Sequence, residues 1–192
     1  MSEILEFLNK NITEKKAANS EIIKNIIEKI VELNLEDMAK NLPDILFKLG
    51  TLLEINNNIK DLSDIFTKNL SIFIQKLLTD KEIKYELSLT PDVRFNLSIG
   101  NKTLGVEIKE GNLNFRSDAF KPPDESFDFS VEVPLNLIPK LFTGEENLMV
   151  ELMAGERIKL WREKQPYNAE KLFELMPLLS IALEKLNLDK WL

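Results

Sequence analysis

Few side chains in this sequence could do chemistry. It has no histidine and no cysteine, which excludes an imidazole general base, a thiolate nucleophile, a disulfide and the usual structural zinc site. The neighbouring carboxylates Glu145–Glu146 and Asp124–Glu125 could serve acid–base catalysis or bind a hard cation. Such pairs are commonplace as solvated loop charges, and the six glycines are too scattered for a phosphate-binding loop. We therefore expect no enzyme activity and no metal or other cofactor.

A different kind of site is suggested by the phenylalanine and methionine residues of the second half of the chain. Flat rings and flexible thioethers adapt to an irregular apolar ligand. The candidate lining of a tunnel between a sheet and its helices is Phe95, Phe115, Phe127, Phe129, Leu141, Phe142, Met149, Met153, Leu172, Phe173 and Met176. The alternative is a closed core without a cavity, because every domain packs apolar stripes.

The composition is that of a folded, acidic protein. Hydrophobic residues make up 44% and charged residues 30% of the chain, and 25 basic against 32 acidic residues give a net charge of −7. No basic stripe is visible for a nucleic acid, and no polybasic segment for an anionic membrane. The sequence also lacks an apolar run long enough for a signal peptide or a membrane span. We expect a cytoplasmic protein that does not insert into membranes.

Residues 1–82 have the periodicity of amphipathic helices. In 20–41, apolar residues recur at spacings of three and four, with Ser20 as the expected N-cap and Pro43 as the residue that ends the helix. Further helices are predicted over 3–9, 44–55 and 62–78. This extension is too rich in isoleucine and leucine for a solvated tail. We favour packing within one chain, with a homodimer as the alternative.

From residue 83 the apolar pattern changes to period two. It predicts strands over 85–89, 93–99, 104–108, 113–115, 127–133 and 157–161, with turns at Gly100–Asn101 and Gly111–Asn112. Helices are predicted over 135–143, 145–153 and 168–186, the last bent or split at Pro177. We expect an α+β domain over 83–192: an antiparallel sheet of about five strands with one face covered by helices and the other wet. The inward positions are Val93, Phe95, Leu97, Ile99, Val106, Ile108, Phe127, Phe129, Val131 and Val133.

Three segments give residues 84–187 a resemblance to a known family. They are the hairpin that ends in Lys109-Glu110-Gly111, the strand 127–133 with the helix that ends at Thr143-Gly144, and the apolar helix, glycine and basic strand of 152–160. In this order they resemble the sterol-carrier-protein-type-two domain, a small lipid-binding module. The family's usual glycine after the last strand is replaced by Arg162-Glu163-Lys164. The resemblance implies the fold more strongly than it implies lipid transfer, since the family also includes modules fused to enzymes.

Two classes of function follow from these observations. The first is a non-catalytic carrier that shelters a fatty acyl, isoprenoid or sterol-like lipid, driven by removal of apolar area from water. The second is a module without a ligand that mediates protein–protein contact or dimerisation, including a role as an accessory factor to an enzyme of lipid or quinone biosynthesis.

Overall fold

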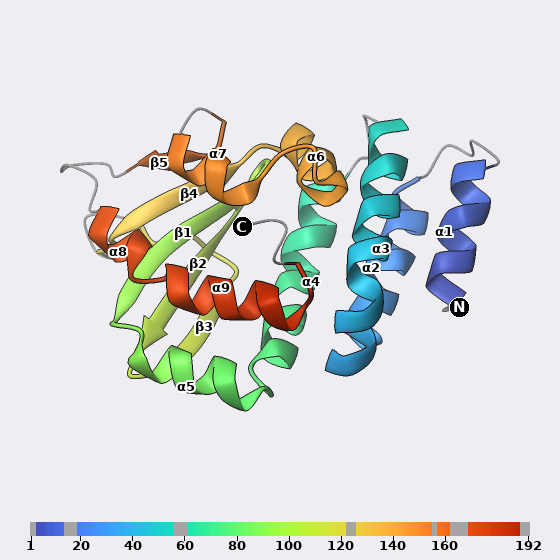
Figure 1. The fold of residues 1–192 in the computed structure, drawn as a ribbon. Helices are drawn as coiled ribbons and strands as arrows, with labels where there is room; N and C mark the ends of the chain where they lie inside the picture. Colours follow the sequence, from blue (N-terminus) through green and yellow to red (C-terminus); the bar gives the residue numbers. More distant parts are fainter. Residues whose placement is uncertain are drawn as a thin grey trace.

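The computed structural model describes residues 3–13, 19–55, 61–121, 126–154, 157–161 and 169–188. It confirms an α+β architecture with helices at the N-terminus. One end of the molecule holds α1, α2 and α3, the other holds the sheet with α5, α7, α8 and α9, and α4 and α6 lie between them (Figure 1). The helices are α1 (Glu3–Thr13), α2 (Ser20–Glu32), α3 (Leu35–Ile55), α4 (Leu62–Leu77), α5 (Lys81–Leu89), α6 (Ile138–Thr143), α7 (Leu148–Ala154), α8 (Ala169–Phe173) and α9 (Met176–Lys185), with a 3-10 turn at Leu135–Leu137.

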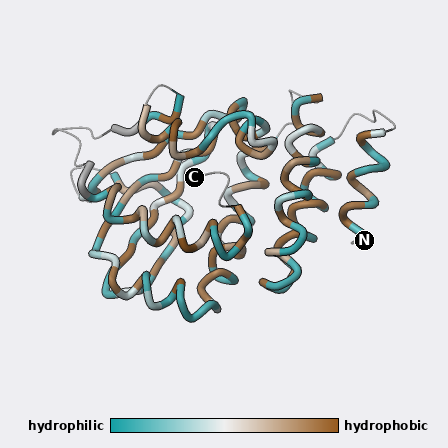
Figure 2. The backbone as a smooth tube through the Cα atoms, in the orientation of Figure 1, coloured by the Kyte–Doolittle hydropathy of each residue, from teal (hydrophilic) through white to brown (hydrophobic). Residues whose placement is uncertain are grey.

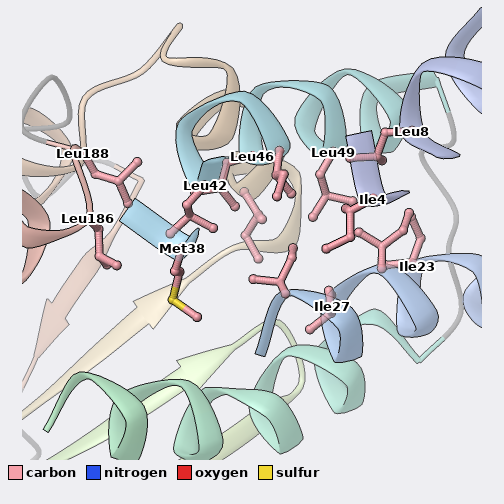
Figure 3. Packing of buried hydrophobic residues seen from close by; sticks show 14 of the residues in the cluster. Ile4, Leu8, Ile23, Ile27, Met38, Leu42, Leu46, Leu49, Leu186 and Leu188 are labelled. Carbon is pink, nitrogen blue, oxygen red and sulfur yellow. The ribbon is translucent and has the colours of Figure 1, made fainter. Parts of the chain in front are cut away.

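The N-terminal helices form one hydrophobic cluster with parts of the second half of the chain. Hydrophobic and hydrophilic residues alternate along these helices (Figure 2), and their apolar positions face one another. Ile138 of α6 and Leu183, Leu186 and Leu188 at the C-terminal end belong to the same buried cluster. Figure 3 shows Leu186 and Leu188 beside Leu42 of α3. The helices therefore bury their stripe within one chain, and this cluster spans the division that we predicted near residue 82.

Helices α3 and α6 cross closely at Gly50, on opposite sides of that division. A Cβ atom on Gly50 would lie 2.7 Å from the carbonyl oxygen of Pro139 and 2.9 Å from Cβ of Phe142. Only a residue without a side chain allows the two backbones to approach this closely. Gly50 therefore fixes the place where the helical half meets the half that contains the sheet.

Three predictions about the N-terminal helices were wrong. The helix predicted over 20–41 is divided between α2 and α3, with Leu33 and Asn34 between them. The N-cap of α2 is Asn19, whose Oδ1 accepts a hydrogen bond from the Ile22 N–H at 2.9 Å, and Ser20 is the first helical residue. Pro43 does not end its helix but lies inside α3. Proline has no N–H for the carbonyl four residues earlier, which here belongs to Ala39. The side-chain amide of Asn187 donates to this oxygen at 2.8 Å, so a distant residue replaces the missing donor.

Residues 85–89 are also helical, although we predicted a strand. Asp80 caps α5, since its Oδ1 accepts from the N–H groups of Glu82 and Ile83 at 2.9 and 3.1 Å. Ile83 and Leu87, four residues apart, are buried, whereas Tyr85 and Leu89 are exposed. The alternating residues that we assigned to a strand therefore lie on opposite sides of a capped helix, with Leu87 on its buried face.

The sheet is mixed, so the expectation of a wholly antiparallel sheet was wrong. Its order is β3-β2-β1-β4-β5, and β1 pairs with β4 in parallel, with Phe95 beside Phe129. The other neighbouring strands pair antiparallel. The hairpin turns predicted at Gly100 and Gly111 are present, each glycine with positive φ. The strands are β1 (Val93–Ile99), β2 (Lys102–Lys109), β3 (Asn112–Arg116), β4 (Phe129–Val133) and β5 (Lys159–Trp161).

The parallel pair requires a connection that runs back along the sheet. Its first described part, 117–121, lies on the face opposite the helices, which we call the outer face. The Asn96 side chain holds it there, with Nδ2 donating to the Phe120 carbonyl at 3.2 Å and Oδ1 accepting from the Phe120 N–H at 2.8 Å. Asn96 and Ser130 on this face are therefore buried. The outer face is covered in its middle, contrary to our expectation that it would be wet.

The inner face follows the predicted alternation. Val93, Val106, Ile108, Phe129 and Val131 are buried. The remaining predicted strand positions Phe95, Leu97, Ile99 and Val133 are half-buried and pack against the two buried clusters. Phe127, just before β4, is buried as well.

Candidate functional site

An apolar layer lies between the inner face of the sheet and helices α7, α8 and α9. Its floor is a pair of aromatic rings, Phe95 and Phe129, stacked with centroids 5.0 Å apart and planes 10° from parallel. The parallel register of β1 and β4 places these residues side by side. Phe129 is fully buried, whereas Phe95 is half-buried. The floor thus has one fixed ring and one ring with part of its surface accessible.

The helices over this floor contribute flexible side chains. Leu152 of α7 and Leu172 of α8 are buried in the same cluster as Phe129 and Leu141. Met149 of α7 and Met176 of α9 pack against this cluster but remain half-buried. Two adaptable thioether side chains therefore border the layer at two different helices.

The structure separates the remaining predicted lining residues. Met153 on α7 and Phe173 on α8 are 64% and 49% exposed, so they belong to the surface. Phe142 packs against Phe66 of α4, edge to face at 5.8 Å, in the cluster of the N-terminal helices. Phe115 lies on β3 at the edge of the sheet. One apolar cluster brings the other predicted residues together. Its buried members include Phe129, Leu141 and Leu172, and the side chains packed against it include Phe95, Met149 and Met176.

An ionic network, the Arg157 clasp, holds α7 in place. The Arg157 guanidinium donates to Glu146 Oε1 at 2.9 Å and to Glu151 Oε2 at 2.9 Å, and Lys140 lies 4.0 Å from Glu146. Glu151 is buried, so its charge requires this partner. The hydrogen bond from Arg157 lowers the pKa of the Glu146 carboxyl, and bonds to both carboxylates raise the pKa of Arg157. The clasp ties the middle of α7, at Glu151, and the turn before α7, at Glu146, to the segment that leads into β5.

Two surface hollows lie near strand β3. A hollow of about 400 Å³ on the outer face contains Arg94, Glu107, Arg116 and Phe120. The two guanidinium groups lie 5.8 and 5.0 Å from the Phe120 ring centroid, and Arg94 is also paired with Glu107 at 2.5 Å. This hollow is the anchorage of the 117–121 segment on the sheet.

The second hollow, of about 460 Å³, lies between α4 and the ends of β2 and β3. We call it the α4–β3 hollow. Its lining is Asp64, Thr67, Lys68, Ser71, Lys102, Thr103, Leu104, Phe115, Arg116 and Ser117. Phe115 alone among these residues was predicted to line a site. The sequence carries no local signal for this group, because it is assembled from three separate elements.

The carboxylates that drew attention in the sequence do not gather into a metal centre. The described residues contain no group of three or more potential metal ligands. Glu146 belongs to the Arg157 clasp, Glu145 is exposed, and Asp124–Glu125 lie outside the described residues. Of the described helices, none combines the length and the apolarity needed to cross a membrane.

Comparison with known proteins gave no match for this chain, either to a protein-family model or to a curated protein.

Proposed function

We propose that this protein is a non-catalytic carrier or binding protein that holds an apolar small molecule or lipid against the inner face of its sheet. The observation that carries the proposal is the pair of half-buried methionines, Met149 and Met176, which pack from two different helices against the cluster that contains Phe129 of the ring stack. Rotation of these side chains would open apolar surface without moving a strand. A ligand would gain about 25 cal/mol for each Å² of apolar area removed from water.

The order of the elements supports the same proposal. The segments that resemble a sterol-carrier-protein-type-two domain form a hairpin (β1–β2–β3), a strand followed by a helix that ends at Gly144 (β4–α6), an apolar helix, a strand and a terminal helix. Helices cover one face of the sheet (Figure 1). The layer between them is the place where an apolar ligand would be sheltered from water.

The test is a thermal shift with palmitate and a matched pair of variants. A ligand that binds only the native state stabilises it by about 2.7 kcal/mol at a hundredfold excess over Kd, so palmitate should raise Tm. Met149→Trp should fill the space beside the stack and abolish this shift, at a cost of about 1–3 kcal/mol to the free protein. Met153→Trp, one helical turn away and largely exposed, should retain the shift.

If the protein is instead an interaction module, apolar ligands should leave its Tm unchanged. Val150 and Met153 expose apolar surface on α7, and such surface can serve protein–protein contact. If palmitate and a range of isoprenoid and sterol ligands leave Tm unchanged in the wild type, the carrier proposal is wrong. Retention of the shift in both Met149→Trp and Met153→Trp would place the ligand elsewhere.

A further inference from the structure

The α4–β3 hollow combines positive charge with apolar surface in a chain whose net charge is −7. Lys68, Lys102 and Arg116 line it together with one carboxylate, Asp64. The hydrogen bond and charge of Asp64, and the charge of Asp61 outside the lining, raise the pKa of Lys102. Its volume of about 460 Å³ lies within the range of small-molecule sites. A local excess of cations on an acidic protein favours an anion at that place.

The three cations are held in different ways. The Lys102 ammonium lies 2.8 Å from Asp64, an ion pair that neutralises part of its charge. Arg116 stacks on the Phe120 ring at 5.0 Å, which fixes the direction of its guanidinium. Lys68 is exposed, and the described residues offer it no ion-pair partner. A bound anion would therefore meet the Lys68 ammonium, which has no ion-pair partner among the described residues, beside the paired ammonium of Lys102. The guanidinium of Arg116 is directed to Phe120, in the hollow on the outer face.

The base of the hollow is apolar. Leu104 and Phe115 are half-buried, on neighbouring strands, and neither belongs to the two buried clusters of the described residues. Because these side chains have apolar surface that no buried cluster covers, a ligand chain could remove it from water. The cations around an apolar base match a molecule with a charged head and an apolar body.

We propose that the α4–β3 hollow binds an oxyanion, a carboxylate or a phosphate, that is carried on a short apolar chain. The head group lies beside Lys68 and Lys102, and the chain lies on Leu104 and Phe115. This site is distinct from the apolar layer under α7 and α9, since its lining comes from α4, β2 and β3.

Four probes separate the parts of this proposal: octyl phosphate, octanoate, inorganic phosphate and octanol, each measured by calorimetry and by amide NMR shifts of the full chain. Octyl phosphate or octanoate should bind, with shifts at Ser71, Leu104 and Ser117, and the comparison of the two identifies the preferred head group. Affinity should fall as salt is raised from 10 to 150 mM, because screening weakens exposed charge pairs. Inorganic phosphate and octanol should each bind more weakly.

The decisive variant is Lys68→Gln, which should weaken binding by up to about fivefold, the upper limit for one exposed charge pair. Lys84→Gln, at another exposed lysine, on α5, is the matched control and should leave binding unchanged. If octanol bound as tightly as the anionic amphiphiles, the charged head group would have no role. If inorganic phosphate bound as tightly as octyl phosphate, the apolar base of the hollow would have no role. Lack of binding by both anionic amphiphiles, or equal effects of the two lysine variants, would overturn the proposal. Binding retained in Met149→Trp distinguishes this site from the apolar layer.

Discussion

Asn187 supplies a hydrogen-bond donor that Pro43 removes from α3. Its side chain donates to the Ala39 carbonyl, the acceptor that would otherwise bond the N–H of residue 43. Asn187 has a φ of 55°, a left-handed conformation that asparagine tolerates better than most residues. One side chain thus satisfies a helix that is distant in the sequence and sets the direction of the chain after α9.

We expect Asn187→Gly to lower the free energy of unfolding by about 0.5–1.5 kcal/mol, the usual contribution of one hydrogen bond. Glycine keeps the left-handed backbone, so the change removes the amide without adding strain. In a Pro43→Ala background, the alanine N–H can bond to Ala39, and the same substitution should cost less. Urea denaturation of the four proteins of this double-mutant cycle measures the difference. Equal costs in both backgrounds would show that Asn187 does not compensate for the proline.

Phe129 and Ser130 are adjacent, almost completely buried and on opposite faces of β4. Phe129→Ala should cost about 3–5 kcal/mol, because it leaves a cavity under Phe95. Ser130→Ala should be neutral or slightly stabilising, since the Ser130 hydroxyl has no hydrogen-bond partner among the described residues. Chemical denaturation tests both changes. A cost above about 2 kcal/mol for Ser130→Ala would contradict an unpaired hydroxyl.

At the scale of elements, the Arg157 clasp gives the position of α7 a dependence on pH. The pKa of Glu146 is lower in the folded protein than its usual value of 4.5, first because Arg157 donates a hydrogen bond to it. A carboxyl with a depressed pKa stabilises the folded state above its unfolded pKa, and this contribution is lost as the pH falls through the folded value. The clasp is therefore complete at neutral pH and weakens below about pH 4.5.

Glu146→Gln should remove this part of the pH dependence. Between pH 3 and pH 7, the free energy of unfolding should rise less steeply in the variant than in the wild type, with the two proteins closest at the acid end. Glu145→Gln, an exposed neighbour outside the clasp, is the control and should follow the wild-type slope. Thermal unfolding at a series of pH values measures both slopes. Identical slopes for Glu146→Gln and the wild type would mean that the clasp does not stabilise the folded state.

Much of the element content could be predicted from local patterns. The α+β class, the hairpin turns at Gly100 and Gly111 and the break before Pro177 are confirmed, because each depends on residues that are close in sequence. Continuation of α3 through Pro43 could not be predicted, since its compensating donor lies at Asn187. The parallel pairing of β1 with β4 depends on the path of a connection whose residues carry no periodic signal.

The types of residue that form the candidate site could be predicted from the sequence, but their positions in the structure could not. Their adaptable Phe and Met side chains identified Met149, Met153, Phe173 and Met176 as candidate lining residues. Only the packing of α7, α8 and α9 decides that Met149 and Met176 border the apolar layer while Met153 and Phe173 are exposed. The cations of the α4–β3 hollow were missed because they come together only when α4 packs beside the end of β2.

At the scale of the whole molecule, the shared cluster couples the two halves of the chain. Helices α1 to α4 bury their apolar faces together with Ile138, Leu183, Leu186 and Leu188. Removal of the N-terminal helices would expose these residues to water. The extension is therefore a structural part of the molecule that carries the sheet.

We expect a single cooperative unfolding transition. Far-ultraviolet circular dichroism is dominated by the helices of residues 3–89, whereas the amide NMR signals of β1 and β2 report on the sheet in the second half of the chain. Because one cluster spans both halves, urea transitions followed by the two signals should coincide in midpoint and slope. Two separated midpoints would show that the halves unfold independently.

The parallel pair of β1 and β4 has a consequence for the protein during its synthesis. The hairpins that join β1, β2 and β3 can form as soon as residue 116 has left the ribosome, since their contacts are local. The other edge of β1 then presents unpaired backbone groups until β4, which ends at Val133, has also emerged. During that interval a nascent chain could pair with the edge of its neighbour. The 117–121 segment, anchored by Asn96, would shorten the search that brings β4 to its place.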